Sequence, residues 1–278
     1  MDGVVLVDKP AGRTSHAVTS TVRRDLGIRK AGHAGTLDPF ATGLLLVLVG
    51  RARRTQRLFT ALPKEYEAVA RFGAVSNTGD PEGEITTTGV LPDGELALPT
   101  GCLRQRPPAF SAVKVGGRRA YDLARRGEEV VLPEREVTVY DFEQLWRSGD
   151  RAGLRLACSS GTYVRSLVAD LGDAYTEELR RTRIGPFDVA GADPRRVVAL
   201  PAALGFLRRL TLSEELARAV AHGRPVEPPA APEPPSPGWE VPEPPPEILL
   251  LDEGGDAVAL ALEREDGSLK PVVGFRPS

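Results

Sequence analysis

The chain has 278 residues, of which 41% are hydrophobic and 27% charged, and its formal net charge is −2. This length and composition suit one large folded domain or a domain with a small appendage, and they exclude a chain that is disordered throughout. The two cysteines lack a CxxC spacing, which argues against a zinc site or a disulfide framework and favours the cytoplasm. No apolar run approaches the roughly 20 residues that span a bilayer, and the N-terminus carries an acid where a signal peptide carries basic residues, so neither a membrane nor export is expected.

The predicted elements alternate between strands and helices along the first 210 residues. Val4–Val7 predicts an apolar strand, and the next helix begins at a cap of Thr14 or Ser15 and ends at Gly27. The apolar run Gly43–Gly50 predicts a strand covered on both faces, and the alternation in Tyr66–Phe72 predicts a half-buried strand. Further helices are expected at Arg119–Arg126, Val164–Leu171 and Arg195–Arg209, and further strands at Val137–Trp146 and Gly153–Ala157. This layout indicates the α+β class.

A proline-rich segment, Arg224–Glu247, divides the chain. Its composition predicts an extended linker, so we expect a first domain over residues 1–224, a linker over 225–246 and a small domain over 247–278. Three short strands are predicted in the last part: Ile248–Asp252, Ala257–Glu263 and Pro271–Phe275.

Charge changes sign at the same place. Residues 1–225 hold 33 Lys and Arg against 27 Asp and Glu, a balance of +6, whereas residues 226–278 hold 3 against 11, a balance of −8. Arginine clusters make the first part a candidate polyanion binder, although a solvated arginine-rich surface would have the same composition. The clusters are 51–54, 118–119, 125–126 and 180–181.

The loop GHAGTLDPFATG, residues 32–43, places a single carboxylate, Asp38, among glycines. Pro39 biases the Asp38 backbone toward extended conformations, and the glycines allow the main chain to approach a ligand closely. The chain has no phosphate-binding GxxxxGK[ST] loop, no GxGxxG motif and only three scattered histidines, so no cofactor or metal is expected. Asp38 could be a nucleophile or a base, or it could simply cap an Asp-Pro turn.

Several stretches, in the same order, resemble the TruB-type tRNA pseudouridine synthases. The fourteen residues from Gly32 to Leu45 resemble that family's signature around its catalytic aspartate. The other matching stretches are DKPAGRTS (8–15), KEY (64–66), TGDPEG (78–83), RPPAFSAVKVGGRRAYDLARRG (106–127), GTYVRSLVADLG (161–172) and LRR (179–181). The resemblance covers nearly all of residues 3–200.

The resemblance implies a pseudouridine synthase fold, with a mixed, largely antiparallel sheet flanked by helices, a central catalytic cleft and a small C-terminal PUA-like β domain. It implies an isomerase that detaches the uracil of uridine 55 in the tRNA T loop at N1 and reattaches it through C5, without a cofactor. Asp38 would start the reaction, either by attacking the nucleoside or by removing a ribose proton. Arg165 would favour its charged form, and Tyr66 would stack on the everted uracil.

The resemblance also assigns binding roles. Tyr163 and Leu179 would line the uracil pocket, and His33 would help to fill the space that the everted uridine leaves. Lys9 and Lys64, with the arginine clusters, would contact phosphates of the T stem-loop. We expect a monomer that binds tRNA and needs no obligate protein partner.

Two alternatives remain open at this point. One is a guide-RNA-dependent, dyskerin-like synthase, and the other is a non-catalytic tRNA-binding or tRNA-folding protein. The glycine-containing stretch VKVGGRRAYDLARRG resembles the stand-alone bacterial form more than the guide-dependent one. The presence of Asp38, Tyr66 and Arg165 together favours an active enzyme. The acidic C-terminal part would repel RNA, which indicates an accessory role for it.

Overall fold

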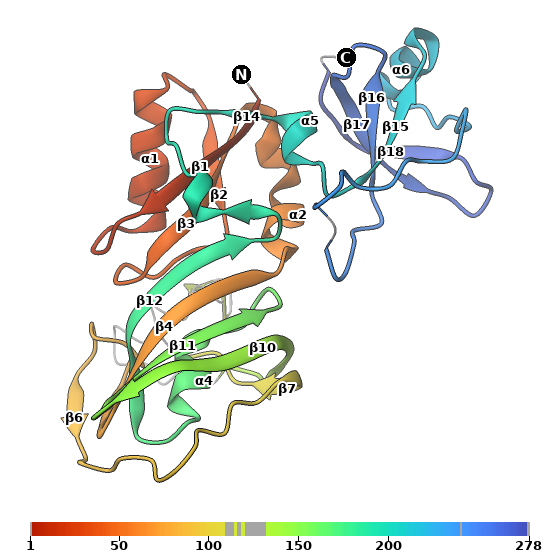
Figure 1. Cartoon of the computed structure of the whole chain (residues 1–278). Helices are drawn as coiled ribbons and strands as arrows, with labels where there is room; N and C mark the ends of the chain where they lie inside the picture. The colour runs from red at the N-terminus through yellow and green to blue at the C-terminus, as the bar shows by residue number, and fades with distance from the viewer. Residues whose placement is uncertain (1, 109–113, 116–117, 120–131, 240, 277–278) are drawn as a thin grey trace.

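A ten-stranded mixed sheet contains most of the strands of the first 200 residues (Figure 1). The computed structural model describes residues 2–108, 114–115, 118–119, 132–239 and 241–276. In spatial order the main path of the sheet is β14 (Val198–Ala199), β1 (Gly3–Lys9), β3 (Thr42–Val49), β12 (Ala174–Ile184), β4 (Lys64–Phe72), β11 (Arg151–Cys158), β10 (Arg135–Ser148) and β7 (Gly101–Gln105). Off this path, β2 (Ala31–Ala34) pairs with β3 and β13 (Phe187–Asp188) pairs with β12. The predicted α+β class and largely antiparallel sheet are confirmed.

The sheet has a narrow seam where β3 meets β12. This pairing is parallel and joins only two residue pairs, Arg180 with Thr42 and Arg181 with Gly43. A Cβ atom on Gly43 would lie 2.2 Å from the Arg181 carbonyl oxygen, so a residue without a side chain is required at this crossing. In Figure 1, β14, β1 and β3 lie on one side of this seam, in the upper part of the molecule. Strands β4, β11, β10 and β7 lie on the other side, in the lower part.

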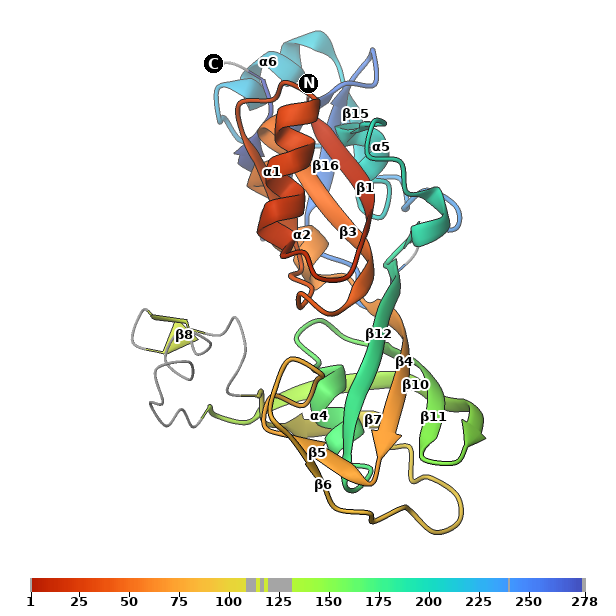
Figure 2. The same cartoon turned by 90° about the vertical axis from the view of Figure 1, so that its left-hand side faces the viewer.

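Local sequence signals explain the main elements. Helix α1 (Ser15–Asp25) begins where the Thr14 hydroxyl accepts a hydrogen bond from the Ala17 amide, as predicted. Strand β3 is buried on both faces: Leu44, Leu46 and Leu48 belong to one core cluster, while its alternate residues pack toward α1. The burial of β4 alternates along the strand, which confirms its half-buried pattern. Helix α4 (Val164–Ala169) lies beside the lower strands (Figure 2).

The predicted helix over Arg195–Arg209 is wrong. This stretch contains β14, the short helix α5 (Leu200–Ala203) and the first residues of β15 (Arg208–Leu212). A turn at Gly205, whose amide donates to the Ala202 carbonyl, ends the helix after one turn. The predicted helix over Arg119–Arg126 lies mostly outside the described residues; its first residue belongs to β9 (Arg118–Arg119), which pairs with β8 (Lys114–Val115).

The remaining small elements connect these strands. They are η1 (Gly50–Thr55), α2 (Gln56–Ala61), β5 (Ala74–Ser76), β6 (Ile85–Thr87) and η2 (Val189–Gly191). Within the described residues, no helix is long and apolar enough to cross a membrane.

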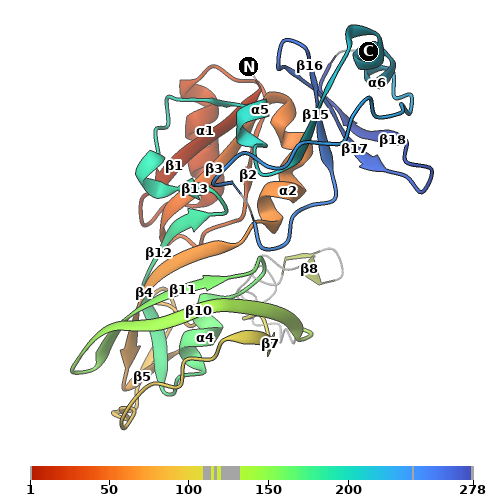
Figure 3. The ribbon, with the colours of Figure 1, turned by 45° about the vertical axis from the view of Figure 1, so that its right-hand side comes forward.

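A second sheet of four strands lies at the C-terminal end of the chain (Figure 3). Its three predicted strands are present as β16 (Ile248–Asp252), β17 (Ala257–Glu263) and β18 (Leu269–Gly274). The fourth strand is β15, which precedes the proline-rich segment, and α6 (Glu214–Ala221) packs on the same core. This sheet therefore uses residues from both sides of the proline-rich segment.

Three arginines of the 51–57 stretch join the two sheets. Arg51 donates to the Phe275 carbonyl, Arg54 donates to the Gly274 carbonyl at 2.7 Å, and Arg57 pairs with Glu247. The Glu247 side chain is 2% exposed. These three guanidinium groups contact the C-terminal part of the chain. They therefore do not form the free polyanion-binding surface that the arginine-rich sequence predicted.

Candidate active site

The loop between β2 and β3 carries Asp38 and is anchored on both sides of it. The Ser15 hydroxyl donates to the Leu37 carbonyl at 3.0 Å and accepts from the Leu37 amide at 2.9 Å. On the other side, the Pro39 carbonyl accepts from the Lys9 ammonium at 3.1 Å and from the Gly12 amide at 2.8 Å. The backbone on either side of Asp38 is thus fixed to α1 and to the end of β1.

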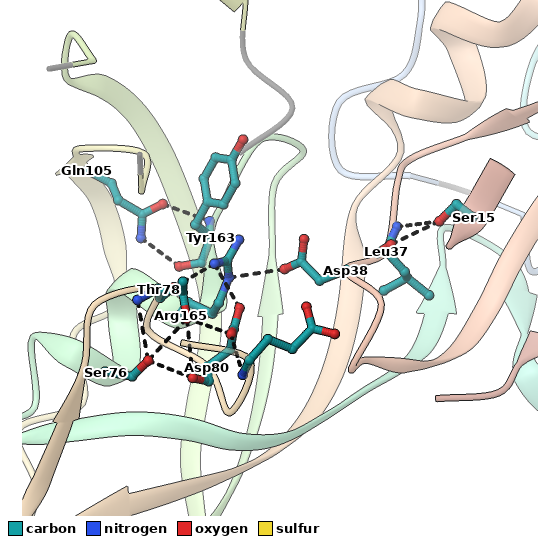
Figure 4. Close-up of polar contacts among 10 residues, drawn as sticks. Ser15, Leu37, Asp38, Ser76, Thr78, Asp80, Gln105, Tyr163 and Arg165 are labelled. Carbon is teal, nitrogen blue, oxygen red and sulfur yellow. Dashed lines mark hydrogen bonds and ion pairs between the residues drawn. The ribbon is translucent and has the colours of Figure 1, made fainter. Parts of the chain in front are cut away.

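Arg165 connects Asp38 to a second carboxylate, Asp80 (Figure 4). Its Nε lies 3.0 Å from Asp38 Oδ2, and its Nη1 lies 3.0 Å from Asp80 Oδ2. Nη1 also donates to the Thr78 carbonyl at 2.6 Å. The Arg165 side chain is 3% exposed, whereas the Asp38 side chain is 34% exposed. A buried guanidinium therefore contacts the partly exposed carboxylate of Asp38.

Asp80 was not predicted as a site residue, although its motif TGDPEG was noted. Its Oδ1 accepts from the Thr78 hydroxyl at 2.7 Å and from the Glu82 amide at 3.0 Å, so the carboxylate is well held. Gly79 adopts φ +74°, and a Cβ there would meet Arg165 Cβ at 3.4 Å. The feature of the sequence that could have indicated this role is a charged residue inside a glycine-containing turn.

The pKa of Asp38 reflects opposing influences. Burial raises it most, the Arg165 guanidinium lowers it, and the Asp80 carboxylate raises it again. The net direction is upward, so the carboxyl is a stronger base than an ordinary aspartate while Arg165 still supports its anion. Such a group can accept a proton or attack an electrophilic carbon. Within the described residues, no group of three or more His, Cys, Asp or Glu could hold a metal ion.

Tyr66 and Leu179 belong to the apolar core that Leu37 of the Asp38 loop also enters. Both are buried, and Leu37 is the residue before Asp38. Burial raises the pKa of Tyr66 to about 12, against a smaller lowering by Arg181. The phenol is therefore neutral near pH 7 and can donate or relay a proton.

Arg181 is a second residue that sequence reasoning did not place in the site. Its Nε donates to the Leu44 carbonyl at 2.8 Å and its Nη2 donates to the Gly35 carbonyl at 2.9 Å. Its positive charge also lowers the pKa of Tyr66. One buried guanidinium thus ties the two ends of the Asp38 loop to each other. The sequence signal was only a basic pair, which indicated surface charge.

Lys9 and Lys64 do not lie where phosphate contacts were expected. Both side chains are buried: Lys9 donates to the carbonyls of Pro10, Arg13 and Pro39, and Lys64 donates to those of Thr60 and Leu62. Burial lowers the pKa of Lys9 to about 8 and that of Lys64 to about 7. Their ammonium groups hold the backbone around the site and are shielded from a polyanion.

Tyr163 lies beside Arg165, whereas His33 lies outside this group of residues (Figure 4). The Tyr163 amide donates to Gln105 at 2.7 Å, and the Gln105 amide group donates back to the Tyr163 carbonyl at 3.0 Å. This pair fixes the start of α4 and hence Arg165. His33 lies on β2 and lines a separate pocket against α1.

Comparison with known proteins agrees with this geometry. The family model of "TruB family pseudouridylate synthase (N terminal domain)" matches residues 23–164. A protein named tRNA pseudouridine synthase B from Thermobifida fusca (strain YX) is 42% identical over a 308-residue alignment that covers 100% of this chain and 99% of that protein. One of the same name from Nocardia farcinica (strain IFM 10152) is 48% identical over 204 residues, covering 67% of this chain and 66% of that protein.

Solved structures with a similar fold include two complexes of Cbf5. The crystal structure of a Cbf5-Nop10-Gar1 complex matches with a TM-score of 0.64 and 25% identity, covering 99% of this chain and 84% of that one. The archaeal box H/ACA sRNP Nop10-Cbf5 complex matches with a TM-score of 0.67 and 23% identity, covering 99% and 86%, which supports the fold alone.

Proposed function

The chain belongs to the TruB family of pseudouridylate synthases, and from this premise we propose that it isomerises uridine 55 in the T loop of tRNA to pseudouridine. The observation that carries the proposal is the contact between Asp38 and Arg165 at 3.0 Å, with Asp38 partly exposed and Tyr66 in the adjoining apolar core. The relatives' name, tRNA pseudouridine synthase B, supports tRNA as the substrate.

The reaction needs no external reactant. Asp38 opens it by attacking the nucleoside or by removing a ribose proton, which leads to cleavage of the bond between C1′ and N1. The uracil turns within the site, a new bond forms between C1′ and C5, and the C5 proton leaves while N1 gains one. The product is an isomer of the substrate, so atoms and electrons balance.

The site residues divide these tasks. The target uridine is extruded from the RNA at a cost of a few kcal/mol. Tyr66 and Leu179 then provide a flat, apolar wall for the uracil, and the neutral phenol relays the C5 proton. Arg165 keeps Asp38 oriented and supports its negative charge. The protein acts alone, as a monomer.

The test is pseudouridine formation on an unmodified tRNA transcript by the purified protein, compared with Asp38→Asn. We expect product at position 55 with the wild type and a loss of at least about 10⁴-fold with the variant. A transcript with cytidine at position 55 should yield no product, and thermal unfolding should show that the variant is folded.

Other outcomes identify the alternatives. Tight tRNA binding without product by the wild type would indicate a non-catalytic RNA-binding protein. Product only after addition of a guide RNA and partner proteins would indicate a guide-dependent synthase.

A further inference from the structure

A polar pocket of about 310 Å³ lies between α1, β2 and α2. Its lining contains imidazole, guanidinium, hydroxyl and amide groups and no carboxylate, and the Gln56 amide is held against the His33 carbonyl at 2.8 Å. The lining residues are His16, Thr19, Ser20, Arg23, Ala31, Gly32, His33 and Gln56. A pocket lined by hydrogen-bond donors and cations without an acid favours an anion.

The pocket adjoins the loop that carries Asp38. His16 directly follows Ser15, whose hydroxyl makes both hydrogen bonds to Leu37 beside Asp38. β2 contributes the opposite wall and leads directly into the same loop. A polymer whose reacting unit is at Asp38 would therefore pass its neighbouring units close to the pocket.

One guanidinium group, that of Arg23, lines the pocket, and that of Arg53 lies beside its β2 wall. His16, Ser20 and Arg23 follow one another at four- and three-residue spacings, so they share one face of α1. The Arg53 Nε lies 3.7 Å from the position that a Cβ on Gly32 would occupy, which places it at the β2 wall. Of the ion pairs made by the described residues, none includes Arg23 or Arg53, whereas Arg51 and Arg57 pair with Asp2 and Glu247.

We propose that this pocket binds a backbone phosphate of the RNA next to the everted nucleotide, with Arg23 and Arg53 as its cationic donors. The proposal rests on the proposed function, because it assumes that RNA reaches Asp38. Guanidinium matches phosphate oxygens with two parallel hydrogen bonds, and His16 and Ser20 can add further donors. A phosphate held here fixes the register of the strand without reading a base.

The test measures binding of an unmodified tRNA transcript as a function of salt. We expect Arg23→Gln and Arg53→Gln each to weaken binding and to reduce the slope of log K against log salt by about 1. The matched control is Arg24→Gln: Arg24 is the next residue of α1, lies outside the pocket lining and pairs with Asp25. Its slope should equal that of the wild type.

A second arm separates the two sources of phosphate. Inorganic phosphate is titrated against bound tRNA at constant ionic strength; it should displace tRNA more readily from the wild type than from Arg23→Gln, because the free ion competes with the RNA phosphate for the same guanidinium. Phosphate that raises the melting temperature of the wild type, and not of Arg23→Gln, without displacing tRNA would overturn the proposal in favour of a site for the free ion. Wild-type salt slopes in both arginine variants would also overturn it.

Pseudouridine formation is measured in parallel, so that the two ideas fail separately. Normal product with unchanged slopes would overturn the phosphate site and leave the function standing. No product from the wild type, together with reduced slopes in the variants, would overturn the function and keep the phosphate site.

Discussion

Arg165 is shared between two carboxylates, and this sharing determines the acidity of Asp38. One edge of the guanidinium contacts Asp38 and another contacts Asp80, so neither acid has the full benefit of the positive charge. Asp80 is buried and held by two further donors, whereas Asp38 is partly exposed. Asp80 therefore fixes the arginine, and Asp38 is the group that can react.

Asp80→Asn should separate these effects. Without the Asp80 charge the pKa of Asp38 falls, so the acid limb of the kcat/KM profile should move to lower pH. The plateau should drop by about 10²-fold, because Arg165 loses the ion pair that positions it. Single-turnover rates across pH would measure both. Asp93→Asn, at an exposed position, should change neither, and an acid limb that stays in place would contradict the prediction.

Lys64 should make stability depend on pH. Its folded pKa of about 7 lies below its ordinary value of 10.5, so between these values the unfolded chain binds the extra proton and stability rises with pH. The Met side chain of Lys64→Met cannot titrate. The free energy of unfolding of this variant should therefore rise less steeply with pH than that of the wild type, and the two slopes should differ by up to about 1.4 kcal/mol per pH unit.

Urea unfolding at several values between pH 7 and pH 10 measures this difference. The exposed Lys30→Met should follow the wild type. Parallel curves for wild type and Lys64→Met would show that the buried ammonium does not lose its proton in this range.

The sequence singled out Asp38 and Arg165, which the structure places 3.0 Å apart, but not the side chains that hold them. Asp38, Tyr66 and Arg165 were candidates because they belong to recognisable motifs. The buried roles of Lys9 and Arg181 could not be found, because a cation in sequence indicates a surface until its carbonyl partners are known. The partners of Arg181, and Pro39 among those of Lys9, are distant in sequence, and local patterns contain no information on them.

At the scale of elements, α1 does more than cover the sheet. The hydroxyl of its first residue, Ser15, forms hydrogen bonds with both the amide and the carbonyl of Leu37. The cap itself is a different residue, Thr14. The start of the helix and the anchoring of the Asp38 loop are therefore separable functions of adjacent side chains.

Ser15→Ala should lower the free energy of unfolding by about 1–3 kcal/mol, because the buried Leu37 amide loses its acceptor. It should also slow the single-turnover rate, since Asp38 is one residue away. Thr14→Ala is the matched control: it removes the cap, should cost about 1 kcal/mol, and should leave the rate unchanged. Equal rate losses in both variants would show that helix fraying, and not the loop anchor, affects Asp38.

Elements with strong local signals were predicted correctly, whereas the strand β15 was predicted as the end of a helix. The cap of α1 and the unbroken apolar run of β3 are visible in short windows of sequence. The stretch Arg195–Arg209 has a helical pattern of apolar residues, but β15 pairs with β16 some forty residues later. That pairing, which the intervening proline-rich segment hides, overrides the local preference.

For the whole molecule, the junction between the two sheets depends on arginine. Phe206 and Leu249 belong to one continuous core cluster, and the contact between Arg57 and Glu247 closes its edge. The C-terminal part thus pairs one of its carboxylates, and two of its backbone carbonyls, with a basic stretch of its own chain.

Arg57→Gln should lower the free energy of unfolding by about 1–3 kcal/mol, because it leaves the Glu247 carboxylate buried without its partner. The loss is below that of a fully buried pair, since the Arg57 side chain is 61% exposed. Adding Glu247→Gln should restore part of the stability, as the unpaired charge is removed. Urea unfolding of the wild type, both single variants and the double variant measures the coupling, and a double variant less stable than Arg57→Gln would contradict this role.

The seam between β3 and β12 also separates the two members of the ion pair. Asp38 lies in the loop before β3, on one side of the seam, and Arg165 lies in α4, which precedes β12 on the other side; only two residue pairs hold these strands together. If the polypeptide were cut between Phe72 and Ala74, neither fragment would contain a working reaction centre, and activity would return only when the fragments reassembled. Pseudouridine formation by the mixed fragments would therefore measure how much of the protein has reassembled.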